Sequence, residues 1–153
     1  NSNDTIIKNI TSINFNAIEI KLFIKSSEIK NKRFGFQLFS KNKDIGFPII
    51  FEPESKSILV GSTKASLDFQ NLYKTKTIEI TIFIDHFLIE VFINNIQSVV
   101  GIYEKFENKN QIKAYSFNGS FIIDKLLIWK LKKINTGYKK AKKNKIWRVK
   151  EKI

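Results

Sequence analysis

Residues 78–103 read IEITIFIDHFLIEVFINNIQSVVGIY, and this stretch decides the fold class of the chain. It contains short runs of β-branched and aromatic residues, which pack well on a pleated surface and lose side-chain freedom in a helix. The runs are interrupted at Asp85 and His86 and again at Asn94 and Asn95, residue types that are typical of tight turns. The stretch therefore predicts three consecutive antiparallel strands joined by turns.

Alternating patterns predict two strands before this stretch. Residues 14–25 place isoleucine or leucine at every second position from residue 18 onward, as in a strand with one face directed inward. Residues 34–39 alternate in the same way if Phe39 takes the outer face. The polar turn between the two segments, at residues 30–33, is short, so we predict that the two strands pair antiparallel.

A turn around Pro53 joins the next two predicted strands, at residues 49–51 and 57–60. Proline fixes φ and has no backbone N–H, so the polar segment that contains it favours a turn over a continued strand. Residues 61–73 follow, and their apolar positions fit neither a helix nor a regular strand. We predict a long loop with one edge strand for them.

A hairpin is predicted near the end of the domain. Asn118 and Gly119 favour the positive φ angles of a type I′ turn, so the strand at residues 111–117 is predicted to pair with the strand at residues 120–129. Trp129 ends this hairpin, and a large aromatic residue on an alternating strand is usually part of the core. We therefore expect it to be buried.

The succession of short strands, with no helical period before residue 135, predicts an all-β fold. The expected architecture is an antiparallel two-sheet β-sandwich of the concanavalin or jelly-roll type. At 153 residues the chain is long enough for one domain with an apolar core and too short for two domains of ordinary size. We assign residues 1–134 to the β-sandwich domain and residues 135–153 to a basic tail, which is either a short amphipathic helix or disordered.

The tail holds about half of the chain's net charge of +13, because residues 139–152 contain eight Lys or Arg and one Glu. One hypothesis is an adaptor that docks on an anionic polymer or membrane surface through this segment. A solvated terminus is the simpler interpretation, and the scarcity of aromatic residues in the tail disfavours a nucleic-acid partner. The candidate anion-binding residues are Lys139, Lys140, Lys142, Lys143, Lys145 and Arg148.

The composition excludes several kinds of chemistry. The chain has no cysteine and a single histidine, His86, which excludes disulfides, zinc-thiolate sites and cysteine catalysis. Its six glycines are scattered and form no phosphate-binding loop, so no cofactor or metal is predicted. No run approaches the roughly 18 apolar residues that span a bilayer. The compartment stays open, because an export signal would have to lie upstream of Asn1.

Asp85 and Glu90 are the obvious pair to test for glycosidase chemistry, which uses two carboxyl groups about 5 to 9.5 Å apart. They flank a turn and have opposite parity along the predicted strands. We expect Asp85 to accept hydrogen bonds from backbone amides in the turn, and Glu90 to pair with a lysine on the outer face. His86 is not expected to form a dyad with Asp85, because adjacent residues of a strand point to opposite faces. No catalytic residue is predicted.

Four segments resemble, in the right order, the C-terminal β-sandwich of glycoside hydrolase family 32, the invertase, levanase and inulinase family. The most specific, IFIDHFLIEVFINN at residues 82–95, is similar to the family's Ile-Phe-Val-Asp-Arg-Ser-Ser-Ile-Glu-Val-Phe-Val-Asn-Asp. Phe87 and Leu88 depart from it, since they stand where the family has two small serines. The other segments are residues 34–38, 50–60 and 115–129. The resemblance implies a structural role for the family-motif residues Asp85, Glu90, Phe92, Asn94 and Trp129.

The resemblance implies an accessory domain with no catalytic centre. In this family the nucleophile lies in a Trp-Met-Asn-Asp-Pro-Asn-Gly motif and the acid/base in a Glu-Cys motif, both on an N-terminal five-bladed propeller, and the chain contains neither motif. The implied partner is a catalytic β-propeller domain, of the same or a partner chain, in a glycosidase that acts on sucrose or fructans. One sandwich face is then expected to carry a bare apolar patch. The alternative is a stand-alone, lectin-like module that binds fructan or another glycan through surface aromatic residues.

Overall fold

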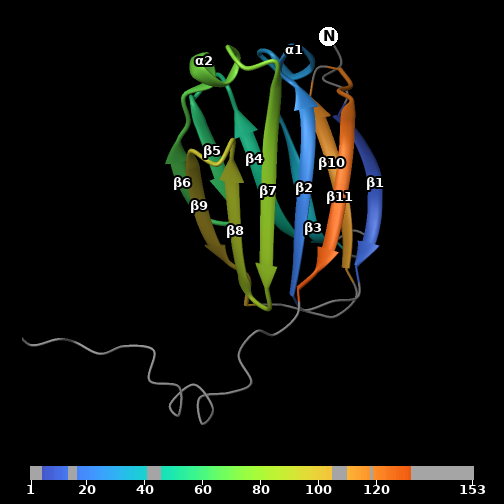
Figure 1. The fold of residues 1–153 in the computed structure, drawn as a ribbon. Helices are drawn as coiled ribbons and strands as arrows, with labels where there is room; N and C mark the ends of the chain where they lie inside the picture. The colour runs from blue at the N-terminus through green and yellow to red at the C-terminus, as the bar shows by residue number, and fades with distance from the viewer. Residues whose placement is uncertain (1–4, 14–16, 41–45, 105–109, 118, 132–153) are drawn as a thin grey trace, which may run out of the picture.

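The computed structural model describes residues 5–13, 17–40, 46–104, 110–117 and 119–131. Within them, eleven strands form two antiparallel sheets packed face to face (Figure 1), which confirms the predicted all-β sandwich. Across sheet A the strands are β1 (Thr5–Ile13), β10 (Asn110–Phe117), β3 (Phe34–Ser40), β4 (Phe47–Glu52), β5 (Ser57–Val60) and β6 (Thr63–Ser66). Across sheet B they are β11 (Ile123–Lys130), β2 (Ala17–Lys25), β7 (Thr77–Asp85), β8 (Leu88–Ile93) and β9 (Gln97–Ile102). Two short helices, α1 (Ser26–Ile29) and α2 (Phe69–Leu72), lie at one end of the sandwich (Figure 1).

Alternate side chains of the strands fill the space between the sheets. The neighbouring strands β2 and β7 direct every second residue inward, and these residues are at most 1% exposed: Ile18, Ile20, Leu22, Ile24, Ile78, Ile80, Ile82 and Ile84. Sheet A adds aromatic rings, and Phe34 stacks on Phe51 with 4.6 Å between the ring centroids. Each such side chain stabilises the fold by roughly 1.5–3 kcal/mol relative to leaving it exposed. The interior is therefore apolar, as the alternation predicts.

Strands β7, β8 and β9 form the three-stranded unit predicted from residues 78–103. The turn between β7 and β8 contains His86 at a φ of +55°, and the turn between β8 and β9 contains Asn94 and Asn95 at +49° and +54°. Left-handed backbone is uncommon outside glycine, but histidine and asparagine adopt it more readily than most residues. The polar interruptions of the sequence pattern thus mark the turns correctly.

The predicted pairing of the strand at residues 14–25 with the strand at residues 34–39 is wrong. β2 pairs with β7 and β11 in sheet B, whereas β3 pairs with β10 and β4 in sheet A. Between them the chain passes from one sheet to the other through α1, whose Ile29 is buried. Stacked sheets lie only about 10 Å apart, so a short connection can join two layers as easily as two neighbouring strands.

The predicted hairpin around Asn118 and Gly119 is also wrong. β10 pairs with β1 and β3 in sheet A, and β11 pairs with β2 in sheet B. The connection crosses from one sheet to the other, and its Phe121 packs on the core with its ring centroid 5.3 Å from that of Phe34. An apolar residue immediately after the turn thus draws the chain over the end of the sandwich. Asn118 itself lies outside the described residues.

Phe39 is buried and does not lie on the outer face as predicted. The ladder between β3 and β10 contains one extra residue on β3, a β-bulge, in the segment next to Phe39. Phe39 adopts a φ of +59°, is 7% exposed and stacks on Tyr103 with 5.0 Å between ring centroids. The bulge changes which residues share a face, so simple alternation fails at the end of this strand.

The sequence pattern does not predict β1, the first strand of sheet A. β1 pairs with β10 along its length, but the register shifts between Asn9 and Thr11. Its isoleucines do not fall at every second position, because the strand contains a bulge there. A strand with a shifted register does not produce the period of two on which the prediction depends.

Residues 61–73, predicted as a loop with one edge strand, form β6 at the edge of sheet A and then the single turn of α2. The carboxylate of Asp68 caps the helix by accepting a hydrogen bond from the N–H of Asn71 at 3.1 Å. Phe69 and Leu72 are buried at 3% and 7% exposure. The irregular apolar spacing of this segment is explained by a strand that gives way to one helical turn.

Candidate functional site

The family-motif residues all lie on or beside sheet B. Asp85 ends β7, Glu90 and Phe92 belong to β8, and Asn94 begins the turn after β8. Trp129 lies on β11 at the far edge, with β2 and β7 between it and β8. The structure thus places four of these residues along β7 and β8, with Asp85 and Asn94 at opposite ends of β8, and leaves Trp129 apart from them.

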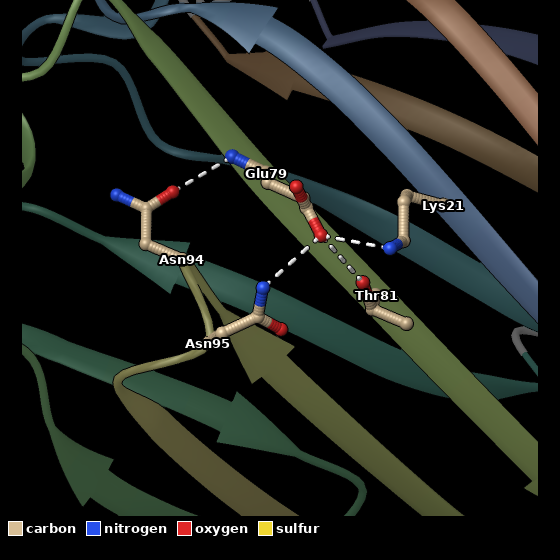
Figure 2. Close-up of polar contacts among 5 residues, drawn as sticks. All are labelled: Lys21, Glu79, Thr81, Asn94 and Asn95. Atoms are coloured by element: carbon tan, nitrogen blue, oxygen red, sulfur yellow. Dashed lines mark hydrogen bonds and ion pairs between the residues drawn. The ribbon is translucent and has the colours of Figure 1, made fainter.

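Asn94 holds the turn between β8 and β9 against β7 (Figure 2). Its side-chain oxygen Oδ1 accepts a hydrogen bond from the backbone N–H of Glu79 at 2.8 Å. Its own N–H donates to the Glu79 carbonyl, also at 2.8 Å. The asparagine therefore extends the ladder of β7 by one side-chain bond, which is a structural role.

The carboxylate of Glu79 is the centre of a polar cluster on the outer face of sheet B (Figure 2). Its Oε1 lies 3.0 Å from Nζ of Lys21 and accepts hydrogen bonds from Thr81 Oγ1 at 3.4 Å and Asn95 Nδ2 at 3.5 Å. These groups come from β2, β7 and the turn after β8, so the cluster ties neighbouring strands together. Lys21 is therefore paired with Glu79 and is not the expected partner of Glu90.

Asp85 does not make the expected hydrogen bonds to backbone amides of the described residues. Its Oδ1 lies 2.7 Å from Nδ1 of His86. We expected these neighbours to point apart, but His86 stands in the turn at a φ of +55°, outside the extended geometry that separates adjacent side chains. Both side chains are exposed.

Asp85 and Glu90 share the outer face of sheet B, which corrects the parity argument from the sequence. Asp85 pairs with Leu88 across a two-residue turn, so Leu88 and Glu90, two residues further on, face the same side as Asp85. The argument from residue parity failed because residues paired across a turn lie on the same face of the sheet, whatever the difference between their numbers. Both carboxyl groups lie on the open face of the sheet, and Asp85 is already engaged by His86.

Glu90 is surrounded by apolar side chains. It lies opposite Phe83 of β7 and Val100 of β9, and its neighbours on the same face of β8 are Leu88 and Phe92. In the part of the chain that the structure describes, no hydrogen bond or ion pair involves its carboxylate. Glu90 is only partly buried, so its carboxylate is open to contact from outside the domain.

The side chains around Glu90 form a surface that we call the apolar surface of sheet B. Leu88 pairs with Ile102, and the rings of Phe83 and Phe92 meet edge to face with 5.7 Å between centroids. The surface lies at the end of the sandwich away from α1 and α2, where β7 turns into β8 (Figure 1). Its most exposed members are Phe87 at 58%, Leu88 at 41%, Val100 at 42% and Ile102 at 62%. It is the kind of bare patch that the sequence led us to expect.

Trp129 is not in the core, so that expectation is wrong. It is 43% exposed on β11, the edge strand of sheet B, where it pairs with Glu19. Glu19 faces outward together with Lys21, and Trp129 shares that orientation. The alternation along β11 puts Leu126 and Ile128 on the inner side instead.

Sequence reasoning did not single out Val100 and Ile102 as surface residues. The signal was present at Phe87 and Leu88, which stand where small serines occur in the motif that the segment resembles. Both side chains are exposed, at 58% and 41%. Phe87 and Leu88, together with the exposed alternate positions Val100 and Ile102 of β9, mark where the apolar surface lies.

Among the described residues, no three His, Asp or Glu side chains gather closely enough to hold a metal ion. None of the helices in the described ranges has the length and apolar character required to cross a bilayer.

Comparison with known families agrees with the geometry. Residues 1–130 match the family described as Glycosyl hydrolases family 32 C terminal. The chain belongs to this family. The match covers the family-32 C-terminal β-sandwich, which is not catalytic by itself, and the chain contains no catalytic domain. No curated protein matches the sequence.

Solved structures share the fold of this family-32 domain at low sequence identity. Chicken galectin 2 superposes with a TM-score of 0.55 and 14% identity, over 80% of this chain and 100% of that one. A toad ovary galectin in complex with thio-digalactose gives 0.53 and 7%, over 82% and 98%. The fructofuranosidase from Schwanniomyces occidentalis, complexed with fructose, gives 0.52 and 12%, over 82% of this chain and 30% of that one. The chain thus has a lectin-like fold and spans less than a third of that fructofuranosidase.

Proposed function

We propose that this domain supports the catalytic domain of a fructosidase that acts on sucrose or fructans, and that it docks on that domain through the apolar surface of sheet B. Family membership supports a glycosidase as the parent enzyme. The fructofuranosidase that shares the fold extends far beyond the shared part, as expected for an enzyme that carries this sandwich as one portion. The observation that carries the docking proposal is the unpaired Glu90 among exposed apolar side chains.

The apolar surface is suited to contact with a protein. Contiguous exposed apolar patches on soluble proteins commonly mark interaction sites, and burying them gains about 25 cal/mol per Å². Here the residues stand on three hydrogen-bonded strands, and the ladder between Leu88 and Ile102 fixes their positions. A surface that is already ordered loses little conformational entropy when it binds, which reduces one of the costs of association.

Glu90 adds a requirement for the partner. If docking covers its carboxylate without supplying a partner, the cost is several kcal/mol, because a buried unpaired charge is poorly solvated. The docked domain should therefore present a lysine or arginine that reaches Glu90. Such a pair contributes more to the choice and orientation of the partner than to affinity.

The test is to express the chain and the family-32 catalytic domain from the same genome as separate polypeptides, and to measure their association by isothermal titration calorimetry. We expect association, and we expect Ile102→Ser to weaken it about tenfold or more, because this side chain is 62% exposed in the free domain. Ile122→Ser is the matched control: Ile122 is 61% exposed, but it lies in the connection before β11, away from the apolar surface.

Two results would contradict the proposal. One is the absence of any association between the two domains. The other is equal weakening by Ile102→Ser and Ile122→Ser, which would point to general destabilisation. Separately, the purified chain is expected to hydrolyse neither sucrose nor levan, and cleavage of either by homogeneous protein would show that it has a catalytic centre of its own.

A further inference from the structure

A cleft lies on sheet A, on the side of the sandwich opposite the apolar surface. Its volume is about 620 Å³, and it is lined by residues 52–55 at the β4–β5 turn together with Asn31, Arg33 and Phe117. These residues stand where β3 begins and where β4 and β10 end, at the end of the sandwich that carries the two helices (Figure 1). The docking of a catalytic domain on sheet B does not involve them.

One wall of the cleft joins an aromatic ring to an ion pair. The guanidinium carbon of Arg33 lies 4.7 Å from the centroid of the Phe117 ring, and its Nη2 lies 3.1 Å from Oε1 of Glu52. The N–H of Phe117 donates to the Arg33 carbonyl at 2.9 Å, so the backbone fixes the two residues side by side. The ring and the Glu52 carboxylate thus hold the guanidinium from two sides.

Serine hydroxyls continue the polar wall. Ser55 Oγ donates to Oε2 of Glu52 at 3.2 Å and lies 2.7 Å from Oγ of Ser57. Both carboxylate oxygens of Glu52 therefore have partners, one from Arg33 and one from Ser55. The result is a connected row of hydrogen-bond donors and acceptors in which each group holds its neighbour in place.

The aromatic wall is supported from behind by buried side chains. Phe117 meets Tyr115 edge to face at 5.7 Å, and the Tyr115 hydroxyl donates to the carbonyl of Ile49 on β4 at 3.2 Å. Tyr115 is 5% exposed and lies over Gly35, where even a single Cβ would come within 2.6 Å of its hydroxyl. The wall is thus rigid before any ligand arrives.

We propose that this cleft binds a neutral oligosaccharide. Sugars require donors and acceptors side by side together with apolar contact, and the cleft offers the Arg33 guanidinium, the Glu52 carboxylate and the apolar atoms of Phe117 and Pro53. The volume lies within the range of ordinary ligand sites, roughly 300–1,000 Å³.

The charges of the cleft favour a neutral ligand over an acidic one. Arg33 is already neutralised by Glu52, and Glu54 adds a second carboxylate to the lining, so a phosphate or an acidic sugar meets repulsion. A cation would have to compete with the guanidinium. A neutral polyhydroxyl compound meets neither obstacle.

The test titrates the intact chain, by calorimetry and by ¹H–¹⁵N NMR, with three probes: a fructosyl trisaccharide, lactose and an oligogalacturonide. We expect one or both neutral sugars to bind and the acidic one to bind at least about tenfold more weakly. We expect Glu52→Gln, which keeps the shape but removes the charge, and Phe117→Leu each to weaken the neutral sugar about tenfold. Far-UV circular dichroism and thermal unfolding show whether each variant is folded.

The controls separate this proposal from the docking of a catalytic domain. Ile102→Ser should leave sugar affinity unchanged, and Glu52→Gln should leave association with the catalytic domain unchanged, since the residues lie on opposite sheets. The cleft proposal is overturned if no neutral sugar binds, if only the acidic sugar binds, or if folded cleft variants bind the neutral sugar as well as the parent does. Loss of domain association alone would overturn only the docking proposal.

Discussion

Asn94 and Glu79 are joined by reciprocal hydrogen bonds, each 2.8 Å long, one from the backbone of Asn94 and one to its side chain. Because β8 ends at Ile93, no strand residue of β8 lies opposite Glu79, and the Asn94 side chain accepts the hydrogen bond from the Glu79 N–H instead. Replacing Asn94 by glycine keeps the positive φ accessible but removes this bond. We therefore expect Asn94→Gly to lower the free energy of unfolding by about 1 kcal/mol, measured by urea denaturation.

Asn95→Gly is the matched control, because Asn95 has a φ of +54° but its side chain makes only a 3.5 Å contact to Glu79. The free energy of unfolding of the Asn95→Gly variant should stay within about 0.5 kcal/mol of that of the parent. If Asn95→Gly costs as much as Asn94→Gly, the hydrogen bond to the Glu79 amide is not what makes Asn94 important.

Gly35 is predicted to be intolerant of even a methyl group. A Cβ at this position would lie 2.1 Å from the Ile49 carbonyl oxygen and 2.6 Å from the Tyr115 hydroxyl. Because the nearest atom is backbone within a paired strand, relief requires the ladder between β3 and β4 to shift. Gly35→Ala should therefore cost about 3 kcal/mol in urea denaturation.

Gly119→Ala provides the comparison for Gly35→Ala. Gly119 has a φ of +113°, but a Cβ there would meet no atom within 4 Å. Only backbone strain opposes the substitution, about 1 kcal/mol. A larger loss at Gly119 than at Gly35 would show that crowding under Tyr115 is unimportant.

Tyr115 makes stability depend on alkaline pH. Burial raises the pKa of its hydroxyl well above the ordinary value of 10.0. The unfolded chain therefore loses this proton at lower pH than the folded chain does. The contribution of Tyr115 to stability should be complete below about pH 10 and fall as the pH rises beyond it.

The measurement is the free energy of unfolding of the parent and of Tyr115→Phe at pH 8 and at pH 11. At pH 8 the variant should be about 1 kcal/mol less stable, because the Ile49 carbonyl loses its donor. The deficit should shrink at pH 11. A deficit that is the same at both pH values would mean that the hydroxyl is accessible to solvent in the folded state.

The tail residues Lys139, Lys140, Lys142, Lys143, Lys145 and Arg148 lie outside the described residues, and anion binding by them stays a prediction. If the tail binds anions, a heparin column should retain the full chain, and retention should decrease steeply with salt. Deletion of residues 139–153 should abolish the retention. Retention of the truncated chain at the same salt concentration would place the polyanion contact elsewhere on the protein.

The parts of the fold that follow local rules were predictable. The alternation of β2 and β7 gave their inward faces, and the polar interruptions at His86 and Asn94 marked the turns. Strand partners were not predictable in the same way, because pairing is a long-range choice. The connection after β10 looks like a hairpin in isolation, but Phe121 gains more contact by crossing the end of the core.

The candidate sites show the same division. The motif around Glu90 could be found by reading one continuous segment, but the face that Asp85 and Glu90 share was predicted wrongly, because the pairing of Asp85 with Leu88 is not visible in the parity of the residue numbers. The cleft could not be found from the sequence, because its residues come from three separate parts of the chain: Arg33 directly before β3, Glu52 at the end of β4 and Phe117 at the end of β10. Each looks like an ordinary charged or apolar position along the sequence. Only the pairing of β10 with β3 and of β3 with β4 places them together.

Trp129 and Phe51 should differ sharply in their contribution to stability, although both are large aromatic residues on strands. Phe51 is 1% exposed and stacks on Phe34 with 4.6 Å between centroids, so Phe51→Ala leaves a cavity and should cost roughly 3–5 kcal/mol. Trp129 is 43% exposed on an edge strand, so Trp129→Ala should cost about 1 kcal/mol or less. Urea denaturation of the two variants provides the comparison. Equal costs would mean that Trp129 belongs to the core after all, and that the outer face of β11 is covered in the folded chain.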